Sequence, residues 1–103
     1  MFALVVRFDL QDAAKADGFD QLVAETVDGI TRHEAGTLVY STHVVEGEPL
    51  ARVFYEVYRD RAAFDDHERQ PHTKHFLSER DRYVSSARVE FLTPVAAKGL
   101  PTG

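Results

Sequence analysis

The segment FYEVYRDRAAFDDH, residues 54–67, joins an extended run to a helical run. Aromatic and β-branched side chains dominate its first part, which predicts a strand over residues 51–58. Asp60 is a residue type that favours a helix N-cap, and Phe64 and His67 follow it one helical turn apart. The segment therefore predicts a strand that passes almost directly into a short helix.

Strands and helices are also predicted on both sides of this segment. They are strands at residues 2–8, 37–45 and 86–93, a helix with an apolar stripe from Phe19 to Ile30, and a helix that begins at Pro71. Gly36 suits the C-terminal stop of the first helix. The order β-α-β-β-α-α-β predicts an α+β fold on the ferredoxin-like split βαβ plan, with a four-stranded antiparallel sheet and the helices on one face.

Both faces of the predicted sheet carry apolar side chains. In residues 51–58, Phe54 and Tyr58 share one face, whereas Val53, Tyr55 and Val57 share the other. The helices can cover only one of these faces. Because a large exposed apolar face is unusual in a soluble protein, we expect a homodimer that packs sheet against sheet.

The composition limits the class of protein. The chain has 103 residues, with 44% hydrophobic and 28% charged side chains, no cysteine and a net charge of −5. These values predict one globular domain, residues 1–95, with a flexible tail at residues 96–103. A disulfide scaffold and a cysteine-ligated zinc site are excluded. The acidic charge argues against nucleic acid binding, and the absence of a long apolar run or signal sequence predicts a cytoplasmic protein without membrane contact.

The segment 54–67, followed by Pro71, His72 and Phe76, resembles the antibiotic biosynthesis monooxygenase (ABM) domain family, which includes small quinol monooxygenases. The stretch EAGTLVY, residues 34–40, also resembles that family's entry into its second strand. The resemblance extends to about Pro94. It implies a dimeric α+β barrel with a ligand pocket between the sheet and the helices of each subunit.

The resemblance does not extend to the branches of the family that use Asn and Trp in catalysis. The haem-degrading branch uses a first-strand Asn, a pocket Trp and a haem-ligating His. This chain contains no Asn and no Trp, and Arg7, His67 and Leu77 align with those three positions. No glycine-rich nucleotide-binding loop is present either. The sequence therefore predicts a protein without a cofactor.

Glu56 and His67 are the first candidates for catalysis. Glu56 lies on the same strand face as Phe54 and Tyr58, where apolar surroundings would raise its pKa and make it a base near neutral pH. The alternative is an ion pair with an arginine, which would hold the sheet or dimer together. His67 shares the inward face of Phe64 and could accept a proton from a phenol. The alternative is a buried imidazole that hydrogen-bonds to the backbone or to a carboxylate.

Other candidates are weaker. Arg7 and His72 are predicted to stabilise an anionic oxygen of the substrate, although a salt bridge to Glu56 or Glu90 would also explain Arg7 and helix capping would explain His72. The predicted pocket residues are Tyr40, Phe64, His75 and Phe76, each of which could instead only fill the core. His67, His72 and His75 do not form a ligand pattern across the Pro71 break, so no metal site is predicted.

These residues support three hypotheses. The first is a cofactor-independent monooxygenase that acts on a quinol or polyphenolic, polyketide-type small molecule with molecular oxygen as co-substrate. Such a substrate supplies its own electrons once a base has deprotonated it. The second is an isomerase of a small carbonyl compound. The third is a non-catalytic dimer that binds a small aromatic ligand.

Overall fold

A computed structural model describes residues 1–100, and its elements follow the predicted order. They are β1 (Phe2–Leu10), α1 (Ala13–His33), β2 (Thr37–Val45), β3 (Glu48–Tyr58), α2 (Arg61–Arg69), α3 (Pro71–Glu79), the 3₁₀ turn η1 (Arg80–Arg82) and β4 (Val84–Leu92). Residues 93–100 form no helix or strand, and the last part of the predicted tail, residues 101–103, lies outside the described residues.

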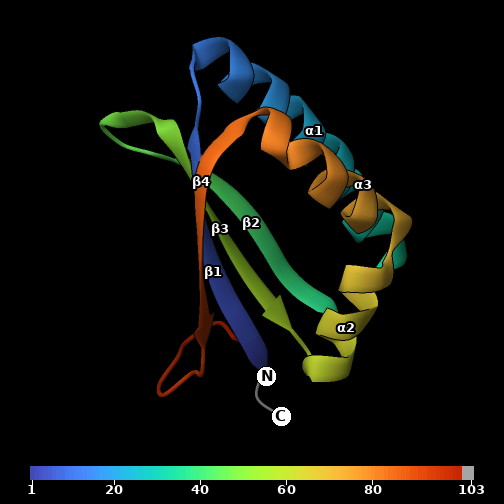
Figure 1. Cartoon of the computed structure of the whole chain (residues 1–103). Coiled ribbons are helices and arrows are strands. Elements are labelled where there is room, and N and C mark those ends of the chain that lie inside the picture. The colour runs from blue at the N-terminus through green and yellow to red at the C-terminus, as the bar shows by residue number, and fades with distance from the viewer. Residues whose placement is uncertain (101–103) are drawn as a thin grey trace.

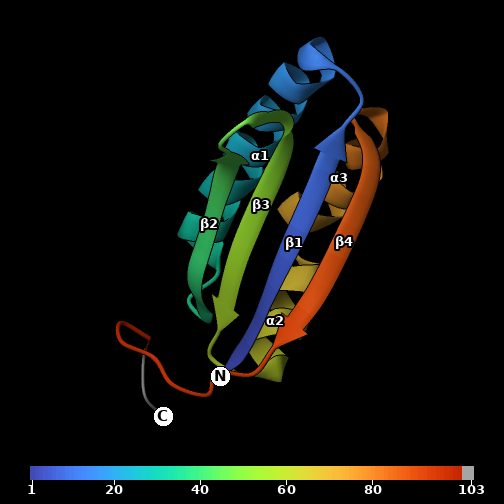
Figure 2. The ribbon, with the colours of Figure 1, turned by 90° about the vertical axis from the view of Figure 1, so that its left-hand side faces the viewer.

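The four strands form one antiparallel sheet in the order β2-β3-β1-β4. All the helices lie on one face of this sheet, and the opposite face is uncovered in the single chain (Figures 1 and 2). The predicted α+β, ferredoxin-like fold is therefore confirmed. The chain after β4 leaves the sheet at the end where β1 begins (Figure 2).

Aromatic side chains from the sheet and the helices build the core between the two layers. The Phe8 ring lies 4.9 Å from that of Phe54 and 5.2 Å from that of Phe19, and the Phe19 and Phe76 rings are 5.8 Å apart. These centroid distances are typical of favourable aromatic pairs. The cluster fixes α1 and α3 over the middle of β1 and β3.

Local capping residues explain where the helices begin. The Asp12 carboxylate accepts a hydrogen bond from the Lys15 amide, so α1 begins earlier than its apolar stripe predicts. Asp60 caps α2 in the predicted way by accepting from the Ala63 amide at 2.8 Å. Pro71 occupies the first turn of α3, where a missing amide hydrogen costs nothing.

Gly36 serves a different purpose from the predicted helix stop. Glu34 forms the C-cap of α1, and Gly36 lies in the following turn with an ordinary backbone conformation. A Cβ atom at Gly36 would approach the Cβ of Ala63 to 2.7 Å. The glycine therefore allows the end of α1 to lie against the start of α2, and this contact brings Glu34 toward α2.

The uncovered face of the sheet is apolar at one end and charged at the other. The strand register places Val39, Val57, Ala3 and Leu92 in one row across the four strands. Two rows further along, Arg7 and Arg88 occupy the β1 and β4 positions instead. The apolar residues thus occupy only part of this face, and of the row only Val39 and Leu92 are not fully buried in the single chain.

Candidate functional site

A cavity of about 180 Å³ lies between the sheet and the helices α2 and α3. It contains five of the residues predicted for the site: Glu56, His67, Tyr40, Phe64 and Phe76. The rest of its lining is mainly apolar and consists of Leu4, Val6, Phe8, Thr26, Phe54, Glu68, Thr73, Leu77, Arg80, Val89 and Phe91. The cavity is therefore an apolar chamber with a small set of polar groups.

The cavity opens over β4. Val89 pairs with Val6 and Phe91 pairs with Leu4, so both side chains face the helix layer. They are nevertheless 46% and 64% exposed, because no helix covers this edge of the sheet. Leu77 of α3 is also exposed and faces the same opening. A ligand can enter between α3 and β4 without disturbing the core.

Glu56 lies at one end of the cavity, near the C-terminal end of β3, and is 4% exposed. Burial raises the pKa of its carboxyl group, while a hydrogen bond that Tyr58 donates to Oε1 at 2.6 Å acts in the opposite direction. The recorded partner is a tyrosine, so Glu56 does not form the arginine ion pair that the sequence left open. No fully buried side-chain polar atom of the described residues lacks a partner, so the remaining oxygen, Oε2, has accessible surface at the cavity.

His67 projects from α2 into the same end of the cavity. Its Nδ1 lies 2.8 Å from Oε1 of Glu34, and the side chain is 6% exposed. A carboxylate accepts hydrogen bonds only, so the imidazole donates its Nδ1 hydrogen, and in a neutral imidazole Nε2 is then the acceptor. Nε2 is the nitrogen available to a ligand in the cavity. A base whose tautomer is held by a carboxylate is the arrangement used in many hydrolytic sites.

Glu34 is the functional residue that the sequence interpretation missed. Its side chain is 1% exposed and accepts hydrogen bonds from Thr37 at 2.7 Å, from His67 and from Nε2 of His72. Burial by itself would raise the pKa of Glu34, but these three donors outweigh burial and lower it to about 2. One signal was present in the sequence: an acidic residue at a helix C-terminus opposes the helix dipole.

His72 lies outside the cavity, in contrast to its predicted catalytic position. The first turn of α3 packs against the end of α1, where a Cβ at Gly29 would be only 2.6 Å from the His72 ring. The ring therefore points at Glu34 rather than at the ligand space. Its place in the structure is that of a donor that holds the Glu34 carboxylate.

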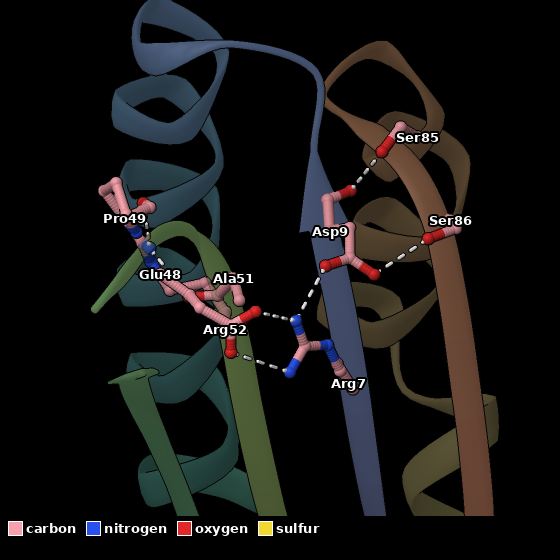
Figure 3. Close-up of polar contacts among 8 residues, drawn as sticks. All are labelled: Arg7, Asp9, Glu48, Pro49, Ala51, Arg52, Ser85 and Ser86. Carbon is pink, nitrogen blue, oxygen red and sulfur yellow. Dashed lines mark hydrogen bonds and ion pairs between the residues drawn. The ribbon is translucent and has the colours of Figure 1, made fainter. Parts of the chain in front are cut away.

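Arg7 lies on the opposite face of the sheet from the cavity. Odd-numbered residues of β1 face outward, and the Arg7 guanidinium pairs with Glu48 at 3.0 Å and with Asp9 at 3.2 Å (Figure 3). Neither partner is the Glu56 or Glu90 that the sequence suggested. Arg7 therefore cannot contact a ligand in the cavity of its own chain, and its predicted role as an anion donor there is corrected.

His75 also lies away from the cavity. It precedes Phe76, whose side chain faces the core, so His75 points to the outer side of α3 and is exposed. It borders a separate surface groove with Gly18 and Tyr83. Within residues 1–100, no group of three or more His, Cys, Asp or Glu side chains is arranged to hold a metal ion. No helix in the same range could cross a membrane.

The family model of antibiotic biosynthesis monooxygenase matches residues 1–79. No curated protein sequence matches the chain. Among solved structures, a candidate antibiotic biosynthesis monooxygenase from Bacteroides thetaiotaomicron superposes with a TM-score of 0.87 at 22% identity, covering 99% of this chain and 95% of that one.

Two further structures are somewhat closer in sequence. A candidate monooxygenase from Lactobacillus acidophilus has a TM-score of 0.84 at 26% identity, covering 89% of this chain and 43% of that longer one. A protein from Shewanella oneidensis has a TM-score of 0.79 at 28% identity, and the match covers 88% of this chain and 87% of that one.

Proposed function

Because the chain belongs to the antibiotic biosynthesis monooxygenase family, we propose that it is a cofactor-independent monooxygenase of a small quinol. The observation that carries the proposal is His67, which lines the apolar cavity and whose Nδ1 is held by the buried Glu34 carboxylate behind it. This pair supplies an oriented base whose side chain is only 6% exposed. Proton removal is the one step that such a substrate requires from the protein before it reacts with oxygen.

The reaction balances without any other reductant. Nε2 of His67 takes the proton of one quinol hydroxyl, and the resulting phenolate transfers electrons to oxygen. One oxygen atom forms a carbon–oxygen bond to the ring, and the oxygen–oxygen bond then breaks. The second atom leaves as water with the proton held by His67 and one from the substrate. A quinol and O₂ thus become a hydroxyquinone and water, and the quinol provides all four electrons.

Glu56 and Tyr40 are suited to hold the substrate rather than to carry its electrons. Glu56 lines the cavity and burial raises its pKa, and in its protonated form the carboxyl can donate a hydrogen bond to a quinone-type oxygen. Burial raises the pKa of Tyr40 well above its ordinary value, so its hydroxyl stays protonated. The Tyr40 ring lies 5.6 Å from the His67 ring and both residues line the cavity, so one ligand can contact both of them.

The size of the cavity favours a substrate with one ring. An engineered cavity of about 150 Å³ holds one benzene molecule, and this cavity measures about 180 Å³. A polycyclic polyketide would extend through the opening beside Phe91. We therefore expect hydroquinones to be better substrates than anthrones.

Oxygen consumption with a panel of hydroquinones and anthrones tests the proposal. Loss of a general base typically costs 10²- to 10⁴-fold in rate, so His67→Ala is expected to lower turnover by about that factor. His75→Ala is the matched control, because His75 lies on α3 outside the cavity. Turnover that persists without oxygen would favour an isomerase, and ligand binding without any turnover would favour a binding protein. Either result would contradict the monooxygenase.

We also propose a homodimer that buries the uncovered face of the sheet. In the apolar row, Val39 and Leu92 keep exposed surface in the single chain, whereas Ala3 and Val57 between them are already buried. The exposed surface of Val39 and Leu92 supports a twofold contact at that end of the sheet. Light scattering should give twice the 11.6 kDa chain mass at micromolar concentration. Tyr55→Lys on this face should release monomers, whereas Gln21→Lys on the exposed side of α1 should not. A monomeric wild-type protein would contradict the proposal.

A further inference from the structure

Arg80 places a positive charge in the lining of the cavity, away from the catalytic pair. It begins η1, and its side chain is 32% exposed, so most of it is withdrawn from water. Its Cζ atom lies 5.9 Å from the centre of the Phe8 ring, which holds the guanidinium over an apolar surface. No catalytic role described above uses this side chain.

Within residues 1–100, the Arg80 guanidinium has one ion pair, with Asp81, and this pair is long. The nearest recorded carboxylate, that of Asp81, lies 3.8 Å from Nε and is 89% exposed, and this distance is too long for a hydrogen bond. Among residues 1–100, the Arg80 side chain makes no recorded hydrogen bond, whereas the neighbouring Arg82 donates to Glu79 at 3.0 Å. A guanidinium has five N–H donors. Arg80 can therefore bind an anion by donating two parallel hydrogen bonds to it, in bidentate geometry.

The charges that line the cavity are separated along its length. Glu56 lies opposite Leu4 on β1. Phe8, under Arg80, is four residues further along the same strand, which corresponds to about 13 Å between the two backbone positions. The acidic end of the cavity is therefore formed by α2 and the C-terminal part of β3, and its basic end by η1. Apolar side chains, including Val6 and Phe54, lie between them.

We propose that Arg80 binds a carboxylate of the substrate, so that the preferred substrate is a hydroxylated aromatic acid with its reacting hydroxyl at His67. The identity of the reacting end rests on the proposed function, whereas the acid-binding end rests on Arg80 alone. The net charge of the chain is −5, so the protein as a whole repels anions. A preference for an acid must then come from a local site.

A matched pair of ligands tests the inference: hydroquinone and 2,5-dihydroxybenzoate, which differ by one carboxylate. Binding is measured by calorimetry under nitrogen, so that turnover does not consume the ligand. We expect the acid to bind the wild-type protein at least about tenfold more tightly, as for a partly buried charge-assisted hydrogen bond. Arg80→Gln should abolish this preference and Arg80→Lys should retain part of it. Arg82→Gln is the control and should leave it unchanged.

Equal affinity for the two ligands in the wild-type protein, or a preference that survives Arg80→Gln, would overturn the inference. The proposed function is judged separately by oxygen consumption. Oxidation of hydroquinone without any preference for the acid would support the monooxygenase and contradict the role of Arg80. Selective binding of the acid without oxygen consumption would support the role of Arg80 and contradict the monooxygenase. Thermal melting of each variant verifies that it is folded.

Discussion

Glu34 and Glu56 are two buried carboxylates of one site, and their environments shift their pKa values in opposite directions. Glu34 accepts hydrogen bonds from one hydroxyl and two imidazoles, and its pKa falls to about 2. Glu56 accepts one hydrogen bond from Tyr58, and burial raises its pKa. Burial opposes ionisation in both, so the number of donors decides the direction in which each pKa shifts.

The two surroundings follow from the elements that carry the residues. Glu34 ends α1, where the start of β2 and the two short helices meet, so side chains reach it from several directions. Glu56 lies within a strand, where the backbone groups of neighbouring strands already pair with one another. Only side chains above the sheet remain as partners, and most of these are apolar. The carboxylate with the lowered pKa therefore orients His67, while the carboxyl group with the raised pKa lines the cavity.

Removal of the Glu34 carboxylate should have the largest effect on stability. Glu34→Ala leaves His67, His72 and Thr37 without their acceptor, and breaking a buried pair of this kind costs about 3–5 kcal/mol. For a domain of this size the melting temperature should fall by more than about 10 °C in thermal denaturation. Glu25→Gln, on the exposed side of α1, should change it by about a degree or two. A small shift in Glu34→Ala would mean that the three donors find other partners.

The acid dependence of stability should show the same contrast without a mutation. The pKa of Glu34 is about 2 in the folded protein and ordinarily 4.5, so its stabilising contribution is complete above about pH 5. It is lost as the pH falls through 4.5 toward 2, and amounts to about 3 kcal/mol. Urea denaturation between pH 6 and pH 3 should show a decrease that is greatly reduced in Glu34→Gln. Parallel curves for the two proteins would contradict the assignment.

Thr37→Val removes one of the three hydrogen-bond donors to Glu34. The pKa of Glu34 should therefore shift in the direction seen for Glu56. The lost hydrogen bond should cost about 1 kcal/mol and raise the pKa of Glu34. NMR titration of the Glu34 carboxyl carbon should show the midpoint moving up from about 2. Thr31→Val is the matched control, because the Thr31 hydroxyl bonds only to a backbone oxygen on the exposed side of α1. An unchanged midpoint would assign the low pKa to the histidines alone.

Glu56→Gln should have the smallest effect on the free energy of unfolding. Unlike the other substitutions, it should not decrease that free energy. A raised pKa in the folded state means that Glu56 contributes stability below its ordinary pKa of 4.5 and loses it as the pH rises. The neutral amide of glutamine does not ionise, so the variant does not lose this stability as the pH rises. Its free energy of unfolding at pH 8 should equal that of the wild-type protein or exceed it by up to about 1 kcal/mol. Urea denaturation at pH 5 and pH 8 measures the difference. Clear destabilisation at pH 8 would show that the ionised form is favoured.

Positions whose face follows from local periodicity could be placed from the sequence. Glu56 shares the strand face of Phe54 and Tyr58, and His67 shares the helix face of Phe64, and the structure places both in the cavity. Residues next to an interruption were placed incorrectly. Pro71 separates α3 from α2, so the rotation of α3 about its axis did not follow from the earlier helix. His72 and His75 consequently point away from the cavity.

The order of the elements, the strand pairs and the inward faces were determined by the sequence itself, because alternation, capping and turn residues act over a few neighbouring positions. The direction in which each carboxyl pKa shifts and the loosely paired charge of Arg80 were decided by the tertiary structure. Glu34 meets His67 and His72 from more than thirty residues away, and Arg80 meets Phe8 across most of the chain. A pKa depends on all the groups that converge on a side chain, and only the folded chain brings them together.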